Sequence, residues 1–275
     1  YPLGHSLSPK IHTAALKASG LDGSYSLFPI SPEDKQGLKD LLARVRSGEI
    51  TGLNVTIPHK QNVIELMDEL TPTAKAIGAV NTIYLHEGKL IGDNTDTSGF
   101  LSDLKRFLTL ECDSLLSHQQ ELAPALQKKA LILGAGGSAR AVVYALLYDG
   151  WDVTIAARRI EQAQQLSQSF GKYDLRLSTF DFQPSTFDLI VNTTPLGMTP
   201  NIEDSPLPEN IVLSPKTVIY DLIYNPRETK LVKDARAQGL SATTGLGMLI
   251  EQAALAFEKW TGAKADRDAM QKAVA

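Results

Sequence analysis

A glycine-rich turn between an apolar strand and a helix constrains the fold of this chain more than any other feature. Residues 130–133 have the pattern of a short buried strand, and a helical pattern runs from the turn to Tyr148. A second strand is predicted over Trp151–Ala156, which completes a βαβ unit. The turn consists of Gly134, Ala135, Gly136, Gly137, Ser138 and Ala139.

This turn fits the G-x-G-x-x-A pattern in the context that a dinucleotide site requires. The first glycine allows a tight turn, the second lets backbone N–H groups approach a pyrophosphate, and Ala139 allows close packing of helix on sheet. A purely structural glycine turn is the alternative, which the complete βαβ unit disfavours. We therefore expect a Rossmann-type domain that binds a dinucleotide.

Strands and helices continue to alternate beyond this unit. Further strands are predicted over Leu175–Ser178, Leu189–Asn192, Val218–Tyr220 and Leu240–Ala242, with helices near 160–169 and 228–238. Such alternation is typical of a parallel sheet with helices on both faces. The expected fold class is α/β, doubly wound in this part of the chain.

The residues after the second strand indicate which dinucleotide binds. An Asp or Glu about 20 residues beyond the glycine turn usually binds the ribose 2′-hydroxyl of NAD. Here the sequence is Ala156-Ala157-Arg158-Arg159, without a carboxylate. Two guanidinium groups can hold the 2′-phosphate of NADP by charge-assisted hydrogen bonds. We expect NADP (NADPH) as the cofactor; the alternative is that Arg158 and Arg159 only begin a solvated helix.

The first hundred residues predict a second α/β lobe. Helices are expected over 10–19, after a Ser8-Pro9 cap, and over Pro32–Val45 and 59–70. Strands are expected over Tyr25–Phe28, Gly52–Ile57, Ala79–Leu85 and Lys89–Gly92, the last two around a Glu87-Gly88 turn. A helix over Phe100–Leu108 would link the lobes, 109–128 is interpreted as a surface insertion, and helices near 247–260 and 265–274 follow the second lobe.

Composition disfavours several classes of function. A formal net charge of -4 gives no basic surface of the kind that nucleic-acid-binding proteins carry. The one cysteine, Cys112, lacks a partner for a disulfide or a zinc site, so we expect a reducing compartment and no metal. No apolar run approaches the roughly 18 residues of a membrane helix. We expect a cytoplasmic monomer or homodimer without nucleic-acid or membrane partners.

Polar residues gather in four short segments of the first lobe, each at a predicted strand end or helix entrance. These segments are Ser6-Leu7-Ser8, Asn54–Lys60, Ala79–Thr82 and Gly92–Asp96. Strand ends and helix entrances are where α/β proteins bind ligands. We therefore expect the substrate there.

At these segments the sequence resembles the shikimate dehydrogenase family, over nearly the whole chain. The motifs that carry the resemblance are Gly4-His5-Ser6-Leu7-Ser8-Pro9, Asn54–Lys60, Gly78–Thr82, Gly92–Asp96, Gly134–Gly137 and Gly245–Ala253. The resemblance implies reversible NADPH-dependent reduction of 3-dehydroshikimate to shikimate, a step of chorismate and aromatic amino acid biosynthesis. It also implies a substrate domain over residues 1–99, completed by C-terminal helices that return to it over 245–275, and an NADP domain over 100–244.

The resemblance assigns roles to individual residues. Ser6 and Ser8 would bind the substrate carboxylate at a helix entrance whose dipole favours an anion; alternatively Ser8 only caps the helix. The residues implied around the ring hydroxyls are Thr56, Lys60, Asn81, Asp96 and Gln252. Those implied near the nicotinamide are Asn192, Thr193, Gly245 and Met248. Tyr224 would point at the substrate, although a structural role fits the sequence equally well.

Lys60 and Asp96 are the expected catalytic pair. Hydride transfer leaves an alkoxide on the former ketone carbon, and a proton must reach it. A lysine ammonium can donate that proton, and Asp96 would keep it protonated and oriented. Either member could be the formal base in the reverse direction, because coupled groups titrate as a unit. The alternative for Lys60 is a solvated lysine at a helix start.

Three other functions remain open at this point. The nearest is a quinate/shikimate dehydrogenase that uses NAD or NADP. Another is a non-catalytic ligand-binding paralogue, which the retention of both Lys60 and Asp96 disfavours. The third is an NAD(P) dehydrogenase that acts on an amino- or folate-type substrate, for which the Ser-Leu-Ser and Asn-Val-Thr segments would have no purpose.

Overall fold

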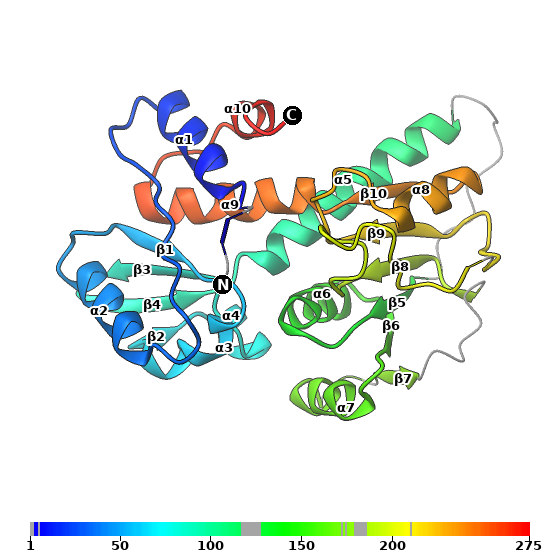
Figure 1. Cartoon of the computed structure of the whole chain (residues 1–275), viewed down its shortest axis with the longest axis horizontal. Helices are drawn as coiled ribbons and strands as arrows, with labels where there is room; N and C mark the ends of the chain where they lie inside the picture. Colours follow the sequence, from blue (N-terminus) through cyan, green and yellow to red (C-terminus); the bar gives the residue numbers. More distant parts are fainter. Residues whose placement is uncertain are drawn as a thin grey trace. The chain divides into compact units, whose positions relative to one another are not determined.

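The computed structural model describes residues 3–4, 6–116, 128–171, 173, 175–178, 186–209 and 211–275. The chain divides into two compact units (Figure 1). Unit 1 comprises Tyr1–Gly99 and Leu249–Ala275, and unit 2 comprises Phe100–Met248. The chain therefore leaves unit 1 after Gly99 and re-enters it at Leu249.

A four-stranded sheet of order β1-β3-β4-β2 lies at the centre of unit 1. Its strands are β1 (Gly52–Asn54), β2 (Glu69–Leu70), β3 (Thr82–His86) and β4 (Lys89–Asp93). The predicted Glu87-Gly88 turn is confirmed, because β3 and β4 form a hairpin around these two residues, whose φ angles are 49° and 76°. β1 pairs antiparallel with β3, and β2 pairs parallel with β4.

Helices complete unit 1. They are α1 (Ser8–Ala18), α2 (Lys35–Arg46), α3 (His59–Asn62), the 3-10 helix η1 (Ile64–Leu66), α4 (Pro72–Ile77), α9 (Leu246–Thr261) and α10 (Arg267–Lys272). Leu42 and Val45 of α2 share a buried core with Ile83 and Leu90 of the hairpin. α1 packs against α10, which joins segments far apart in the sequence.

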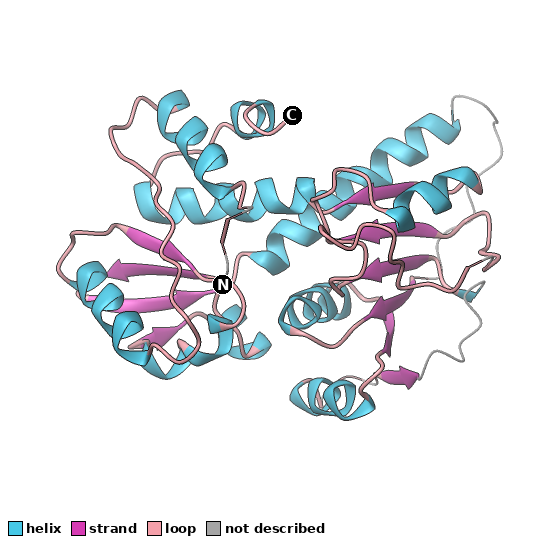
Figure 2. Ribbon diagram, in the orientation of Figure 1, coloured by secondary structure: helices cyan, strands magenta, loops and turns pink. Residues whose placement is uncertain are grey.

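Six parallel strands form the sheet of unit 2 (Figure 2). They are β5 (Lys129–Leu133), β6 (Asp152–Ala156), β7 (Arg176–Ser178), β8 (Leu189–Asn192), β9 (Val218–Asp221) and β10 (Ala242–Thr244). Their order, β10-β9-β8-β5-β6-β7, is that of a Rossmann sheet, and the order reverses between β5 and β8. The predicted doubly wound α/β fold is confirmed.

Alternation along β5 explains why helices cover both faces of this sheet. Ala130 and Ile132 belong to one core, with residues of α5 (Asp96–Leu116), α6 (Gly137–Tyr148) and α7 (Ile160–Ser169). Leu131 and Leu133 belong to a second core, with residues of α8 (Lys230–Ala237). Successive side chains of a strand point to opposite faces, so an unbroken apolar run requires cover on both.

The strand predicted over Tyr25–Phe28 is wrong, because residues 21–31 contain no strand. Pro29 follows directly and has no N–H to donate to a ladder. Ile30 N donates instead to Phe28 O at 3.0 Å, which closes a local turn. The side chains of Phe28 and Ile30 pack on the core of unit 1. The apolar pattern here reflects burial rather than strand pairing.

The single helix predicted over 59–70 is also wrong. The segment divides into α3 and η1, and Met67 then takes extended angles, φ -87° and ψ 145°. Asp68 N donates to Leu90 O at 3.0 Å, and the Asp68 carboxylate accepts from Leu90 N at 2.7 Å. Pairing with the edge of β4 therefore overrides the helical spacing.

Several other elements exist with different ends. The helix predicted from Pro32 begins at Lys35, because Asp34 caps it by accepting from Gly37 N. The linking helix extends over Asp96–Leu116, so the surface insertion is wrong for residues 109–116; residues 117–127 lie outside the described residues.

Three predicted strands also have different limits. The strand predicted over Gly52–Ile57 ends at Asn54, and the one predicted from Ala79 begins at Thr82. The last strand is Ala242–Thr244 rather than Leu240–Ala242, because Leu240 N still closes the end of α8. No helix in the described part of the chain is long and apolar enough to cross a membrane. The described residues also contain no cluster of His, Cys, Asp or Glu that could hold a metal ion.

Candidate active site

The predicted dinucleotide turn follows β5, beside the point where the strand order of unit 2 reverses. Gly134 has φ 105°, and a Cβ there would lie 2.8 Å from Thr193 Oγ1, so both backbone and space require glycine. Thr193 Oγ1 donates to Leu133 O at 2.7 Å. The loop after β8 therefore packs directly on the turn after β5.

Gly136 and Gly137 leave the start of α6 open to an anion. Apart from the adjacent residues and the backbone of the same helix, no atom of the described residues lies within 4 Å of a Cβ built on either glycine. Gly136 is the N-cap residue and no side chain caps the helix, so N–H groups of its first turn remain available. Such groups bind phosphate, helped by the helix dipole. With Ala139 buried beneath, the turn fits the pyrophosphate of a dinucleotide.

Arg158 and Arg159 follow β6 closely, and both side chains are exposed. Arg159 is the N-cap residue of α7. The ion pairs formed by the described residues of unit 2 involve neither guanidinium. Both groups are therefore accessible to a 2′-phosphate.

Asn192 is fully buried at the end of β8, where it shapes the loop that follows. Its Oδ1 accepts from the Thr194 N–H at 2.9 Å and from Thr194 Oγ1 at 2.7 Å. Its Nδ2 donates to Asp221 Oδ1 at 2.9 Å and to Leu196 O at 3.4 Å. Its polar atoms are thus engaged within the protein, so Asn192 acts on this loop and does not present its amide to a ligand.

The other residues expected near the nicotinamide lie at the start of α9, with Gly245 just before the helix and Met248 in its first turn. A Cβ on Gly245 would clash with Leu222 O, so the close approach of the two segments requires glycine. Met248 is buried in the core of unit 2. Tyr224, in the loop after β9, is half-buried, and burial raises the pKa of its hydroxyl. Tyr224 lies in unit 2, whereas the other predicted substrate residues lie in unit 1.

Lys60, Asn81 and Asp96 meet beside the sheet of unit 1. Lys60 Nζ lies 2.5 Å from Asp96 Oδ2, and Asn81 Nδ2 donates to Asp96 Oδ1 at 2.8 Å. The Lys60 and Asp96 side chains are only 12% and 9% exposed. Both carboxylate oxygens are engaged, while the ammonium has three N–H groups and can direct others to a ligand.

Strand register explains why these residues meet. Asn54 of β1 pairs with Thr82 of β3, which pairs with Asp93 of β4, so three strand ends lie in one row. The polar segments next to these strand ends therefore lie side by side. Val80 N donates to Lys60 O at 2.8 Å, which ties α3 to the same edge of the sheet.

Gln252 of α9 joins this group. Its Oε1 accepts from Asn81 Nδ2 at 3.4 Å, and its Nε2 donates to Leu249 O at 2.8 Å. Thr56 is exposed between β1 and α3, outside this hydrogen-bonded group. The structure thus brings Lys60, Asn81, Asp96 and Gln252 together and leaves Thr56 apart from their hydrogen bonds.

Ser6 and Ser8 lie at the start of α1, where the predicted Ser8 cap is wrong. The helix includes Ser8, and Ser6 Oγ accepts from Ser8 N at 3.3 Å. The Ser8 hydroxyl instead interacts with Tyr25, whose own hydroxyl donates to Asn54 Oδ1 at 3.0 Å. Burial raises the pKa of Tyr25 to about 12, despite the opposing effect of Ser8, so this hydroxyl is a neutral donor.

Sequence reasoning assigned no role to Asn94 and Thr95, two buried residues that support the group. Asn94 Oδ1 accepts from Asp96 N at 3.1 Å, and Asn94 Nδ2 donates to Ala79 O at 3.0 Å. Thr95 N donates to Asn81 Oδ1 at 2.8 Å. An Asn that bonds the backbone two residues on is a common turn signal, which could have identified Asn94.

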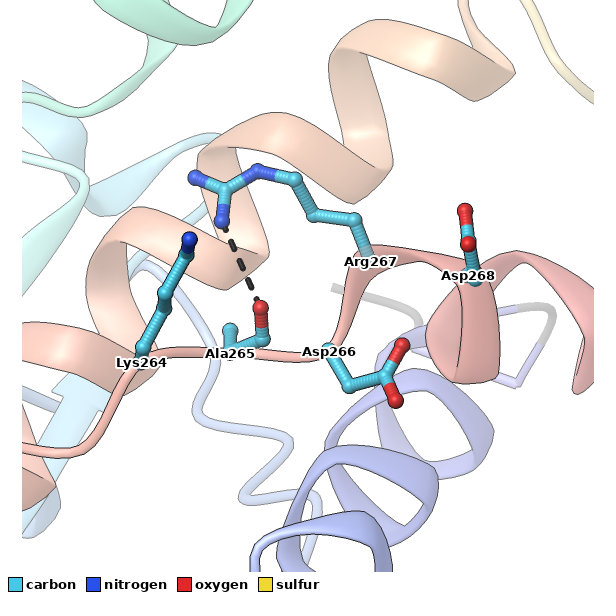
Figure 3. A pocket seen from close by; sticks show the side chains of 5 residues that line it. All are labelled: Lys264, Ala265, Asp266, Arg267 and Asp268. Carbon is cyan, nitrogen blue, oxygen red and sulfur yellow. Dashed lines mark hydrogen bonds between the residues drawn. The ribbon is translucent and has the colours of Figure 1, made fainter.

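An open hollow on unit 1 has none of these residues in its lining (Figure 3). Its lining consists of Lys264, Ala265, Asp266, Arg267 and Asp268. Arg267 is already paired with Glu251 at 2.7 Å and Glu258 at 2.9 Å, and it also donates to Ala265 O. This cation therefore serves to join α9 and the start of α10.

Three family models match the chain. Residues 1–83 match the shikimate dehydrogenase substrate binding domain, 117–230 match shikimate / quinate 5-dehydrogenase, and 245–275 match the shikimate 5'-dehydrogenase C-terminal domain. The NADP-dependent shikimate dehydrogenase of Salinibacter ruber is 42% identical over 284 residues, which cover 100% of this chain and 93% of that protein.

Solved structures match equally fully. Shikimate 5-dehydrogenase from Thermus thermophilus, in complex with NADP(H) and shikimate, is 37% identical with a TM-score of 0.83, covering 99% of this chain and 95% of that one. Quinate dehydrogenase from Corynebacterium glutamicum, in complex with NAD, is 30% identical with a TM-score of 0.85 and the same coverage.

A Rossmann unit with an open glycine turn and a second α/β unit with a buried lysine–carboxylate pair define a nicotinamide-dependent oxidoreductase. The chain is an enzyme of this class. It belongs to the shikimate dehydrogenase family, because its relatives match over the full length of the chain.

Proposed function

We propose that the chain catalyses the reversible, NADPH-dependent reduction of 3-dehydroshikimate to shikimate. The observation that carries this proposal is the Lys60–Asp96 pair, held by Asn81 beside the sheet of unit 1. Binding alone requires no proton donor of this kind. Family membership and the NADP-dependent relative support the choice of substrate and cofactor.

NADPH, when bound, supplies the hydride that reduces the ketone carbon. As this carbon becomes tetrahedral, negative charge develops on its oxygen, and a proton must be added there. Lys60 Nζ donates that proton, and its positive charge stabilises the oxygen before the transfer. In the direction of oxidation, the Lys60–Asp96 pair takes the proton back.

Asp96 orients the lysine, and its surroundings keep it in place. It is the first residue of α5, where the helix dipole favours a carboxylate. Because Asn81 holds the second oxygen, the carboxylate cannot rotate away from Lys60 without losing a hydrogen bond. Asn81, Gln252 and Thr56 would bind ring hydroxyls, and Ser6 and Ser8 would bind the substrate carboxylate.

In this proposal unit 1 binds the substrate and unit 2 binds NADPH. Residues 134–139 hold the pyrophosphate at the start of α6, and Arg158 and Arg159 hold the 2′-phosphate. Thr193 and Gly245 border the nicotinamide, and Tyr224 contributes a neutral hydroxyl to the substrate. The open glycine turn and the two exposed arginines support these assignments.

Turnover of shikimate and quinate, each with NADP and with NAD, tests the proposal. We expect the highest kcat/KM for shikimate with NADP. Absence of turnover of shikimate with either cofactor would contradict the proposal. The similarity to an NAD-bound quinate dehydrogenase makes quinate oxidation the second candidate, and a higher kcat/KM for quinate would establish it.

A further inference from the structure

Asp221, at the end of β9, is a buried carboxyl group that the proposed reaction does not use. Three donors reach it from three segments: Asn192 Nδ2 at 2.9 Å, Ile223 N at 3.1 Å and Thr229 Oγ1 at 2.7 Å. Asn192 and Ile223 share Oδ1, and Thr229 binds Oδ2. A carboxylate suits this position because it only accepts hydrogen bonds, and three donors converge on it.

The first oxygen of Asp221 is connected to the dinucleotide turn. It fixes the Asn192 amide, which in turn holds the N–H and the hydroxyl of Thr194. Thr194 Cγ2 would lie 3.0 Å from a Cβ on Gly134, so Thr194 packs directly against the turn. The position of this loop therefore depends on the hydrogen bond between Asn192 and Asp221 of β9.

The second oxygen holds the other side of the same region. Thr229 Oγ1 donates to Asp221 and accepts from Val232 N as the N-cap of α8. Asp221 thus joins the loop after β8, the loop after β9 and the start of α8. The loops lie at the carboxyl ends of neighbouring parallel strands, where Rossmann sheets bind their ligand.

We propose that Asp221 is a positioning residue for the NADPH site, which it builds by anchoring the Asn192–Thr194 loop to β9. The inference rests on the proposed function, because it takes this edge of the sheet to bind NADPH. Asp221 touches no ligand itself, since it is fully buried.

The groups that form hydrogen bonds with Asp221 are uncharged. β8 and β10 carry no titratable side chain, and the loop after β9 contributes Tyr224, which burial keeps neutral, and the exposed Arg227. On α8, Lys233, Asp234 and Arg236 are exposed, and Lys230 is paired with Asp234 at 2.7 Å. Glu228, next to Thr229, is paired with Arg236. Asp221 is therefore linked to the Asn192–Thr194 loop and to the start of α8 by hydrogen bonds rather than by ion pairs.

Direct titration of the protein with NADPH, followed by fluorescence, tests the inference without any turnover. We expect Asp221→Ala to raise the dissociation constant of NADPH about 10-fold or more, as expected when a buried charge-assisted network is lost. Asp221→Asn should restore binding to within about 3-fold, because an amide can accept from Asn192 and donate to Thr229. Thr194→Val, at a half-buried loop position, should weaken binding in the same direction as Asp221→Ala.

Thr217→Val is the matched control for stability. Thr217 is equally buried and precedes the other end of β9, where its hydroxyl donates to Phe187 O at 2.8 Å. Its loss should reduce stability and leave NADPH binding unchanged. Unchanged binding by both Asp221→Ala and Thr194→Val, or equal weakening by Thr217→Val, would overturn the inference, as would a wild-type protein that fails to bind NADPH. A protein that binds NADPH but oxidises no shikimate would contradict only the proposed substrate.

Discussion

Lys60 Nζ lies 2.5 Å from Asp96 Oδ2, while Asn81 Nδ2 holds the other oxygen of that carboxylate at 2.8 Å. If this pair transfers the proton, Lys60→Ala should lower kcat for shikimate oxidation by about 10² or more, with KM little changed. Steady-state kinetics with saturating NADP measures both constants. A large rise in KM at unchanged kcat would make Lys60 a binding residue instead.

Lys259 offers a matched control for that substitution. It forms a second lysine–aspartate pair in unit 1, with Nζ 2.7 Å from Asp93 Oδ2. Lys259→Met removes a half-buried pair of the same type without touching Lys60. We expect a loss of stability, because Asp93 loses the cation that compensates its buried charge, and a kcat within about 3-fold of the wild type, because Lys259 pairs with neither Lys60 nor Asp96.

In the proposed function the Ser8 hydroxyl binds the substrate carboxylate, and α1 does not use this hydroxyl as a cap. We expect Ser8→Ala to raise KM for shikimate about 10-fold with a small effect on kcat, as when one hydrogen bond to a charged group is lost. Thr13→Ala, at an exposed position on the same helix, is the control and should change neither constant. An unaltered KM for Ser8→Ala would place the substrate carboxylate elsewhere.

Arg158 should determine the preference of the enzyme for NADP over NAD. Loss of a charge-assisted hydrogen bond to phosphate removes about 1.5–3 kcal/mol, so Arg158→Ala should raise KM for NADP roughly 10- to 100-fold. KM for NAD, which lacks that phosphate, should stay nearly constant. Arg176→Ala removes another exposed arginine of unit 2 and should alter neither value. An equal rise for both cofactors would show that Arg158 supports the fold rather than the 2′-phosphate.

The sheet of unit 2 could be predicted from sequence because its signals are local. β5 and β8 contain the unbroken apolar runs 130–133 and 189–191, and the glycine turn marks the entrance to α6. The errors fall where a distant partner decides the structure. Asp68 pairs with Leu90, 22 positions away, and so converts the end of a helical pattern into a strand.

The candidate site shows the same limit. Polar segments at strand ends and helix entrances indicated where the substrate binds, and the family resemblance together with the need for a proton donor singled out Lys60 and Asp96 within them. Sequence could not reveal that Asn192 turns inward, since its partner Asp221 lies 29 positions away. The bond from Asn81 to Gln252 spans 171 positions. Hydrogen-bond partners of this kind depend on strand order and register, which no single segment encodes.

His12 should make the stability of unit 1 depend on pH. It is buried and stacks on Tyr25, with ring centroids 4.3 Å apart, and neither ring nitrogen has a hydrogen-bond partner in the described part of the chain. Burial lowers the pKa of His12 to about 4, against a smaller opposing effect of Asn54. Between about pH 6.5 and 4, His12 is protonated in the unfolded chain but stays neutral in the folded one. The free energy of unfolding therefore decreases by about 3 kcal/mol as pH falls through this range.

His12→Phe keeps the stacked ring and removes the proton site. Urea denaturation at several pH values between 4 and 7.5 should show that the variant loses less stability in acid than the wild type. It should also be at least as stable at pH 7.5, because two buried nitrogens without partners are removed. A stability difference between the two proteins that is constant over this pH range would contradict the assignment.

Asp221 should make the stability of unit 2 depend on pH in the opposite direction. Burial raises its pKa to about 6 from the ordinary 3.8, against the opposing effect of its three hydrogen bonds. Between about pH 4 and 6 the folded state therefore binds more protons than the unfolded state. The stability from this group is fully present below about pH 4 and decreases as pH rises to 6, by about 3 kcal/mol.

In the wild type, the pH dependences of stability caused by His12 and Asp221 oppose each other. Together these two groups should therefore change the stability little between pH 4 and 6.5. Asp221→Asn removes the pH dependence caused by Asp221, so this variant should become more stable relative to the wild type as pH rises from 4 to 6. His12→Phe removes the pH dependence caused by His12, so this variant should become more stable relative to the wild type as pH falls. Urea midpoints of the two variants, measured in parallel at each pH, should therefore change in opposite directions as pH rises. Parallel curves would mean that neither buried group changes its pKa on folding.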